Sequence, residues 1–165
     1  MIRVAIVTVS DSAVAGTRTD LSGPALEKHV LELGWMVVTK SLVPDETQQI
    51  AALLVSLADG GSVDVILTTG GTGLALRDVT PEATRAIAHR EVPGFGELMR
   101  SEGRKSAKFA ALSRGGAATR GATLIVNLPG SPRGAVDSLI AVAELIPHSV
   151  DLLQGRTEHS SQRAK

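Results

Sequence analysis

The sequence predicts an α/β domain of three layers, in which helices cover both faces of a mostly parallel sheet. Three short runs are rich in β-branched residues and apolar without alternation, at Val4–Val9, Val63–Thr69 and Leu124–Leu128. Continuous apolarity of this kind is typical of strands that are buried on both faces. Segments with the apolar spacing of helices separate these runs, and such alternation of strand and helix is the pattern of βα units.

The first half of the chain begins with the strand at Val4–Val9, which is followed by a long loop. A helix is expected at Ala25–Leu33, because Gly34 supplies a favourable helix end. A second strand is expected at Trp35–Val43, with a more polar middle than the first. The helix expected at Asp45–Ala58 carries one apolar stripe, formed by Ile50, Leu53, Leu54 and Leu57.

The second half of the chain continues the alternation of strands and helices. Its helices are expected at Pro81–Ala88, around Glu97–Met99, around Ala107–Leu112, at Ser131–Leu145 and at Pro147–Leu153. A brief edge strand is expected before Gly121, and Pro81 occupies the first position of its helix. We expect residues 1–155 to form a single domain and the polar residues 156–165 to be a disordered tail.

Composition excludes several classes of protein. The chain has no cysteine, which removes disulfides, thiolate metal sites and a cysteine nucleophile. The 17 Lys and Arg balance the 17 Asp and Glu, and aromatic residues are only 2%, so a nucleic-acid-binding protein is disfavoured. No apolar run has the length of a membrane span, and the first residues do not resemble a signal peptide. We therefore expect a cytoplasmic protein that binds neither nucleic acid nor membrane.

The unusual residues of the chain follow its predicted strands. In a parallel sheet the carboxyl ends of neighbouring strands share one edge, and ligands bind there. Four loops should therefore converge on one pocket. They contribute Ser10, Asp11, Ser12, Asp45, Gly70, Gly71, Thr72, Gly73, Asp78, Gly130 and Ser131.

The strongest of these segments is TTGGTGLALRDVTPEAT, from Thr68 to Thr84. Glycines let backbone N–H groups approach an anion, although a glycine cluster can equally be a simple turn. The segment is neither a Walker A motif, which needs Gly-Lys-Ser/Thr, nor a dinucleotide fingerprint, because Leu76 replaces the third glycine. If the segment binds phosphate, we expect Gly71→Val to weaken ligand binding without lowering the melting temperature.

Several of these residues also have a purely structural interpretation. Asp45 begins a capping-box pattern, so it is a candidate helix cap as well as a metal ligand. Asp78 fits either a loop-stabilising Asx turn or a functional carboxylate. Ser131 fits the N-cap of the last long helix, a place that also suits an anion. Arg77 fits either phosphate pairing or a solvated surface residue, and the three residues after the first strand fit a turn.

The motifs taken together resemble one family. The run GGTGLALRDVTPEAT is similar to the signature of the molybdopterin adenylyltransferase family of MogA type, which also includes the G domain of gephyrin. The resemblance continues at Ser10-Asp11-Ser12, at Asp20–Pro24, at Val43-Pro44-Asp45 and at Asn127–Pro132, in the family's order over nearly the whole chain.

The resemblance implies a fold, a reaction and a site. The fold would be MogA-like, and the reaction would be transfer of AMP from ATP to molybdopterin with release of pyrophosphate, dependent on Mg²⁺. Asp45 and Asp78 would be the catalytic, metal-binding carboxylates. The glycine loop and Ser10–Ser12 would bind substrate or nucleotide, and Gly130 and Ser131 would lie on the pterin side.

The resemblance also implies partners and leaves alternatives. The protein would be a homotrimer that makes transient contact with the enzyme that inserts molybdenum. One alternative is a catalytically inactive MoaB-type paralogue that binds pterin or nucleotide, and another is a scaffold. The presence of both Asp45 and Asp78 favours the active enzyme.

Overall fold

The computed structural model of the chain describes residues 1–156. Of the predicted disordered tail at 156–165, only Arg156 falls within this part. The prediction for residues 157–165 lies outside the described residues.

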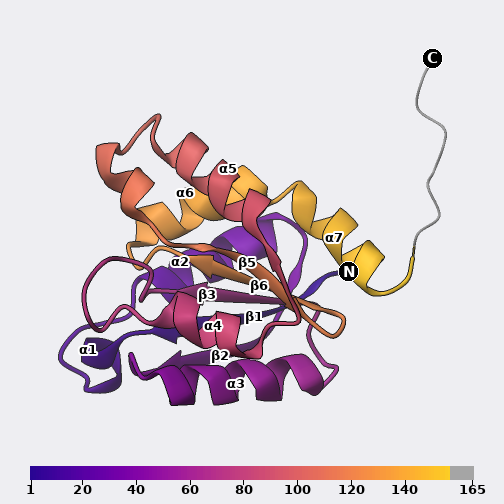
Figure 1. Ribbon diagram of the computed structural model, residues 1–165, viewed down its shortest axis with the longest axis horizontal. Coiled ribbons are helices and arrows are strands. Elements are labelled where there is room, and N and C mark those ends of the chain that lie inside the picture. Colours follow the sequence, from indigo (N-terminus) through magenta and orange to yellow (C-terminus); the bar gives the residue numbers. More distant parts are fainter. Residues whose placement is uncertain (157–165) are drawn as a thin grey trace.

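A six-stranded sheet forms the centre of the molecule (Figure 1). Its strands are β1 (Arg3–Val9), β2 (Met36–Val43), β3 (Val65–Thr69), β4 (Arg90–Val92), β5 (Gly116–Arg120) and β6 (Thr123–Leu128). The order across the sheet is β2-β1-β3-β6-β5-β4. The first four strands in this order are parallel, whereas β5 is antiparallel to β6 and β4 is antiparallel to β5. The predicted mostly parallel sheet is thus confirmed.

Helices cover both faces of this sheet, as the sequence predicts (Figure 1). They are α1 (Asp11–Val14), α2 (Ser22–Glu32), α3 (Thr47–Asp59), α4 (Thr80–Ile87), α5 (Pro93–Gly103), the 3-10 helix η1 (Lys108–Leu112), α6 (Pro132–Val142) and α7 (Leu145–Leu153). Successive residues of a strand point to opposite faces. Ile6 of β1 therefore packs in the core under α2, α5, α6 and α7, while its neighbour Val7 packs in the core under α3 and α4.

Some element boundaries differ from the prediction. The helix expected to begin at Asp45 begins at Thr47, and the short helix expected around Glu97–Met99 is the middle of the longer α5. The strand expected before Gly121 is β5, but it lies between β6 and β4, so its expected position at the edge of the sheet is wrong. The sequence pattern missed α1 and β4, which is the edge strand. Both are very short, and β4 gains its hydrogen bonds from β5 rather than from an apolar pattern of its own.

The strand order places a crevice at one edge of the sheet. β2 lies on one side of β1 and β3 lies on the other, so the chain reverses its direction of travel across the sheet at β1. The connections that leave the carboxyl ends of β1 and β3 therefore diverge, and a crevice opens between them. Ser10 and Gly70 are the first residues after these two strands.

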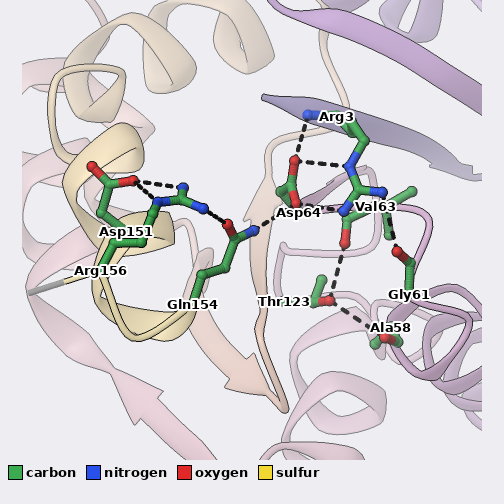
Figure 2. A network of polar contacts seen from close by, with 9 residues as sticks. All are labelled: Arg3, Ala58, Gly61, Val63, Asp64, Thr123, Asp151, Gln154 and Arg156. Atoms are coloured by element: carbon green, nitrogen blue, oxygen red, sulfur yellow. Dashed lines mark hydrogen bonds and ion pairs between the residues drawn. The ribbon is translucent and has the colours of Figure 1, made fainter. Parts of the chain in front are cut away.

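At the opposite end of the sheet, where the parallel strands begin, a polar network connects distant segments (Figure 2). The Asp64 side chain is only 7% exposed and accepts hydrogen bonds from the Arg3 backbone N at 2.8 Å and from Arg3 Nη2 at 2.8 Å. Gln154 Nε2 donates to the same carboxylate at 2.7 Å. Asp64 thereby ties β1 to the C-terminal end of α7, far from the crevice.

We expect Asp64→Ala to lower the free energy of unfolding by about 2 kcal/mol near neutral pH, because several charge-assisted hydrogen bonds are lost. Burial alone would raise the pKa of Asp64, but the hydrogen bonds from Arg3 outweigh burial and hold this pKa below its ordinary value. The stabilisation is therefore present above the ordinary aspartate pKa and is lost as the pH falls through the lowered one. Urea unfolding at pH 7 and at low pH measures both effects.

The matched control for this test is Asp137→Ala, since Asp137 forms an exposed ion pair with Arg133 at 3.4 Å. Exposed pairs contribute little to stability, so this variant should differ from the parent by less than about 0.5 kcal/mol. Equal stability of the Asp64 and Asp137 variants at neutral pH would contradict the role of the network.

Candidate functional site

A cleft of about 440 Å³ occupies the crevice between the carboxyl ends of β1 and β3. Its walls include residues from all four predicted loops, namely Ser10, Asp45, Gly70, Gly71, Asp78, Gly130 and Ser131. A second, more apolar cavity of about 560 Å³ adjoins it and is lined by Thr72 and Gly73. Gly130 and Ser131 belong to the walls of both cavities, so the two lie side by side at these residues.

Asp11 and Asp45 connect the loop after β1 to the loop after β2. The Asp11 backbone N donates to Asp45 Oδ2 at 2.9 Å, and the Asp45 backbone N donates to Asp11 Oδ1 at 2.9 Å. The segment after β1 is thus locked to the segment after β2. Asp11 and Ser12 are not among the residues that line the cleft, so the structure gives Asp11 a supporting position and brings only Ser10 of this trio to the wall.

Arg77 completes this cluster of charges from the glycine-rich segment. Its guanidinium donates to both carboxylate oxygens of Asp11, at 2.6 and 3.1 Å, and to Glu46 Oε1 at 2.9 Å. The hydrogen bond from Arg77, followed by the bond from the Asp45 backbone, holds the pKa of Asp11 below its ordinary value. The Arg77 side chain is 58% exposed, so it is a solvated surface residue as one alternative expected, and it also pairs with two carboxylates.

Asp45 does not cap a helix. The N-cap of α3 is Glu46, and no side-chain hydrogen bond caps this helix end. The capping-box interpretation fails because the Asp45 side chain turns toward Asp11 instead. Burial, together with the nearby charges of Asp11 and Asp78, raises the pKa of Asp45 above its ordinary value. Because burial and neighbouring negative charges destabilise the ionised Asp45 carboxylate, binding of a cation would stabilise it strongly.

Asp78 lies near Asp45 and shapes its own loop. Its Oδ2 accepts a hydrogen bond from the Ala75 backbone N at 2.9 Å, three residues earlier, so the side chain stabilises the loop. The expected Asx turn is wrong, because the Thr80 backbone N donates to Gly71 O instead. The bond from Ala75 takes one oxygen of Asp78, and the bond from Asp11 likewise takes only Oδ2 of Asp45. Oδ1 of each carboxylate remains for a ligand in the part of the chain that the structure describes.

These two carboxylates fit a Mg²⁺ ion that is bound together with phosphates. Residues 1–156 contain no group of three or more His, Cys, Asp or Glu that could enclose a metal. Mg²⁺ usually takes only one or two carboxylates and completes its shell with water and substrate phosphate. Asp45 and Asp78 both line the cleft and could supply that number of ligands.

The glycines of the loop stand where no side chain fits. Gly70 has φ +105°, and a Cβ there would lie 2.2 Å from Val9 O. Gly71 has φ +66°, and its Cβ would lie 2.3 Å from Thr80 Oγ1, which itself donates to Gly70 O at 2.9 Å. The structure thus contradicts the expectation that Gly71→Val leaves stability unchanged. Strain and the clash with Thr80 would lower the melting temperature as well.

Gly73 gives a cleaner test of the site than Gly71. Its φ lies in the range that side chains adopt, yet a Cβ there would stand 2.7 Å from Asp78 Oδ2. We expect Gly73→Ala to displace this carboxylate and to change the melting temperature little. In the adenylyl transfer that the resemblance implies, kcat should fall about 10-fold. Gly94→Ala is the control, because nothing lies within 4 Å of its Cβ. Wild-type kcat in Gly73→Ala would show that the position of the Asp78 carboxylate is not critical.

In the loop between β6 and α6, the contacts of Ser131 confirm that it caps a helix. Its side chain accepts a hydrogen bond from the Gly134 backbone N at 3.1 Å and caps α6. The N-terminus of this helix lies at the wall that the two cavities share, where it favours a negative charge. Gly130 passes close to the glycine loop, since a Cβ on it would lie 3.2 Å from Gly70 Cα.

Several residues of the cleft were not predicted as site residues, and Thr8 and Asp20 are two of them. Asp20 accepts hydrogen bonds from the Ser22 and Gly23 backbones, at 3.1 and 3.0 Å, and from Thr8 Oγ1 at 2.7 Å. Thr8 and Asp20 both line the cleft. In the sequence Asp20 appears only in the segment Asp20–Pro24 that carries the resemblance, and no pattern placed its side chain at the cleft.

Fold and site together define an α/β protein whose crevice, built from glycine amides, a helix N-terminus and two carboxylates, suits phosphorylated ligands. The sequence matches the family described as "Probable molybdopterin binding domain" over residues 5–148, and the chain belongs to this family.

Individual relatives agree with this assignment. The chain is 42% identical to the molybdopterin adenylyltransferase of Helicobacter pylori, over 93% of the chain and 89% of the relative. It is 39% identical to the molybdopterin adenylyltransferase of Escherichia coli, over 93% and 86% of the two chains. The crystal structure of the molybdopterin biosynthesis enzyme MoaB from Thermus thermophilus has a TM-score of 0.89 and 50% identity, covering 94% of this chain and 98% of that one. A structure of MogA with a TM-score of 0.86 confirms the predicted MogA-like fold.

Proposed function

We propose that the protein is a molybdopterin adenylyltransferase that transfers AMP from ATP to molybdopterin. The observation that carries the proposal is the meeting of Asp45, Asp78 and the glycine loop at one cleft, beside an apolar cavity that shares its wall. Relatives named for this activity span about nine tenths of the chain. The proposal includes a cytoplasmic location, where ATP is available, and the described residues contain no helix long and apolar enough to cross a membrane.

The reaction joins two polyanions. A terminal phosphate oxygen of molybdopterin attacks the α-phosphorus of ATP, the bond from that phosphorus to the bridging oxygen breaks, and pyrophosphate leaves with the bond's electron pair. The attacking oxygen is already anionic at neutral pH, so no strong base is needed. Positioning and charge neutralisation supply most of the catalysis in such a transfer.

The residues of the cleft fit these two tasks. The backbone N–H of Gly71 can approach phosphate closely because no side chain stands in the way, whereas the Gly70 N–H donates to Leu128 O at 3.2 Å and shapes the loop. The N-terminus of α6 at Ser131 adds a favourable dipole. Asp45 and Asp78 would hold Mg²⁺, which when bound would neutralise charge on the phosphates. The apolar cavity beside them suits a flat heterocyclic ring.

The direct test is incubation of the protein with molybdopterin, ATP and Mg²⁺, followed by detection of adenylylated pterin and pyrophosphate. Formation of both products in equal amounts is the expected result. Tight binding of pterin or nucleotide without product, under conditions in which the Escherichia coli enzyme is active, would instead favour the inactive binding protein.

We further propose that the protein is a homotrimer. Among residues 1–156, the edge strand β2 pairs only with β1, and on one of its faces Met36, Val38 and Leu42 are each exposed by more than two fifths. Exposed strands with an apolar face of this kind are usually covered in solution. Light scattering should give three times the chain mass of 17.1 kDa, and a stable monomer at working concentration would contradict the proposal.

Passage of the product to the enzyme that inserts molybdenum is also part of this proposal. The loop at the mouth of the site exposes Leu74 and Leu76, by 67% and 99%, and such side chains suit a transient contact.

A further inference from the structure

The loop that carries Asp78 has little packing of its own. Leu74, Ala75 and Leu76 are exposed, and within the loop the Asp78 backbone N donates to Ala75 O at 2.9 Å. A cavity of about 600 Å³ adjoins the loop at Leu74. Arg77 ties the outer side of this loop to Asp11 and Glu46, but these hydrogen bonds are exposed. A loop with so few buried contacts needs a further constraint to keep a metal-binding carboxylate in place.

Arg114 supplies this constraint from the segment before β5. Its backbone N donates to Thr72 O at 2.8 Å, and its Nε donates to Gly73 O at 2.8 Å. Its Nη2 donates to Asp78 O at 2.6 Å, and Nη1 pairs with Glu82 of α4. One side chain thus joins the beginning of the loop to its end.

Arg114 is itself held in place by a second arginine. Arg100 of α5 donates from Nη1 to Ser113 O at 3.2 Å and to Gly115 O at 2.9 Å, the carbonyls on either side of Arg114. Gly96 makes room for this contact, because a Cβ on it would lie 3.0 Å from both terminal nitrogens of Arg100. The helix α5 is therefore connected to the Asp78 loop through two guanidinium groups in series.

We propose that Arg114 is a positioning residue that sets the geometry of the Asp78 carboxylate, with Arg100 holding Arg114. The planar guanidinium has several donors in fixed directions and can bind Gly73, Asp78 and Glu82 at once, which a single ammonium group cannot. Arg114 does not line the cleft itself, so it acts on the reaction through the loop. This inference rests on the proposed function, in which Asp78 binds Mg²⁺.

The test compares Arg114→Lys with Arg120→Lys. Arg120 lies at the other end of β5, where it donates to Ile87 O at 2.9 Å and pairs with Asp59, so the control loses the same kinds of contact away from the site. For Arg114→Lys we expect the Mg²⁺ concentration at half-maximal rate to rise about 10-fold and kcat to fall about 10-fold. Arg120→Lys should keep both values. KM for ATP at saturating Mg²⁺ should change little in either variant.

A second measurement needs no turnover. Mn²⁺ binding in the presence of ATP, followed by electron paramagnetic resonance, should weaken in Arg114→Lys and, to a smaller degree, in Arg100→Lys, but not in Arg120→Lys. Unchanged Mn²⁺ affinity in a folded Arg114→Lys variant would overturn the inference. If the Arg114 variant does not fold, unchanged Mn²⁺ affinity in Arg100→Lys would overturn it instead. A parent protein that binds Mn²⁺ and ATP but forms no product would instead count against the proposed function alone.

Discussion

Asp78→Asn is expected to lower kcat for adenylyl transfer roughly 100-fold or more, because the variant loses a negative charge that would bind Mg²⁺ opposite the phosphates. The amide oxygen of Asn can still accept the hydrogen bond from the Ala75 backbone, so the loop should keep its shape. Since the lost interaction acts mainly in the transition state, kcat and kcat/KM should fall together. Steady-state kinetics at saturating and limiting Mg²⁺ measures this.

Asp151→Asn is the matched control for Asp78→Asn, because Asp151 pairs with Arg156 at the opposite edge of the sheet. Its activity should equal that of the parent. If Asp78→Asn were fully active at limiting Mg²⁺, Asp78 would serve the loop only, and the role proposed for the metal at this carboxylate would be wrong.

Asp45→Asn is expected to lower turnover to a similar extent, about 100-fold, and at the same time to stabilise the protein without Mg²⁺. The raised pKa of Asp45 arises from burial and from the charges of Asp11 and Asp78. An acid with a raised pKa favours folding below its ordinary pKa, and that contribution is lost as the pH rises through the raised value. At neutral pH the charged Asp45 therefore opposes folding, and Asn removes the charge.

Thermal unfolding with and without Mg²⁺ separates these effects. The melting temperature of Asp45→Asn should exceed that of the parent without Mg²⁺, and the difference should shrink when Mg²⁺ and ATP are present. Asp59→Asn is a control of opposite sign, because the hydrogen bond from Arg120 lowers the pKa of Asp59, so its loss should destabilise the protein slightly. Full activity of Asp45→Asn would leave Asp78 as the one carboxylate required.

The sequence alone predicted most of the fold. Strands such as Val65–Thr69 are buried on both faces of the sheet. Because such strands are apolar at every position, they can be recognised in the sequence without an alternating pattern. The antiparallel place of β5 and the existence of β4 could not be predicted in this way. The pairing of β4 and β5 depends on which strands become neighbours in the folded sheet, and the local sequence of a strand does not specify its neighbours.

The sequence also predicted the loops that form the candidate site, because the segments after parallel strands meet at one end of the sheet, although Asp11 and Ser12 do not line the cleft and Thr8 and Asp20 were missed. Only the tertiary structure decided what each one does. Asp45 has a capping pattern, yet its side chain turns to Asp11, since a nearby backbone donor from another loop competes successfully with the helix end. Arg114 lies 36 residues beyond Asp78, and contacts over such a separation are set by packing of whole elements rather than by any local pattern.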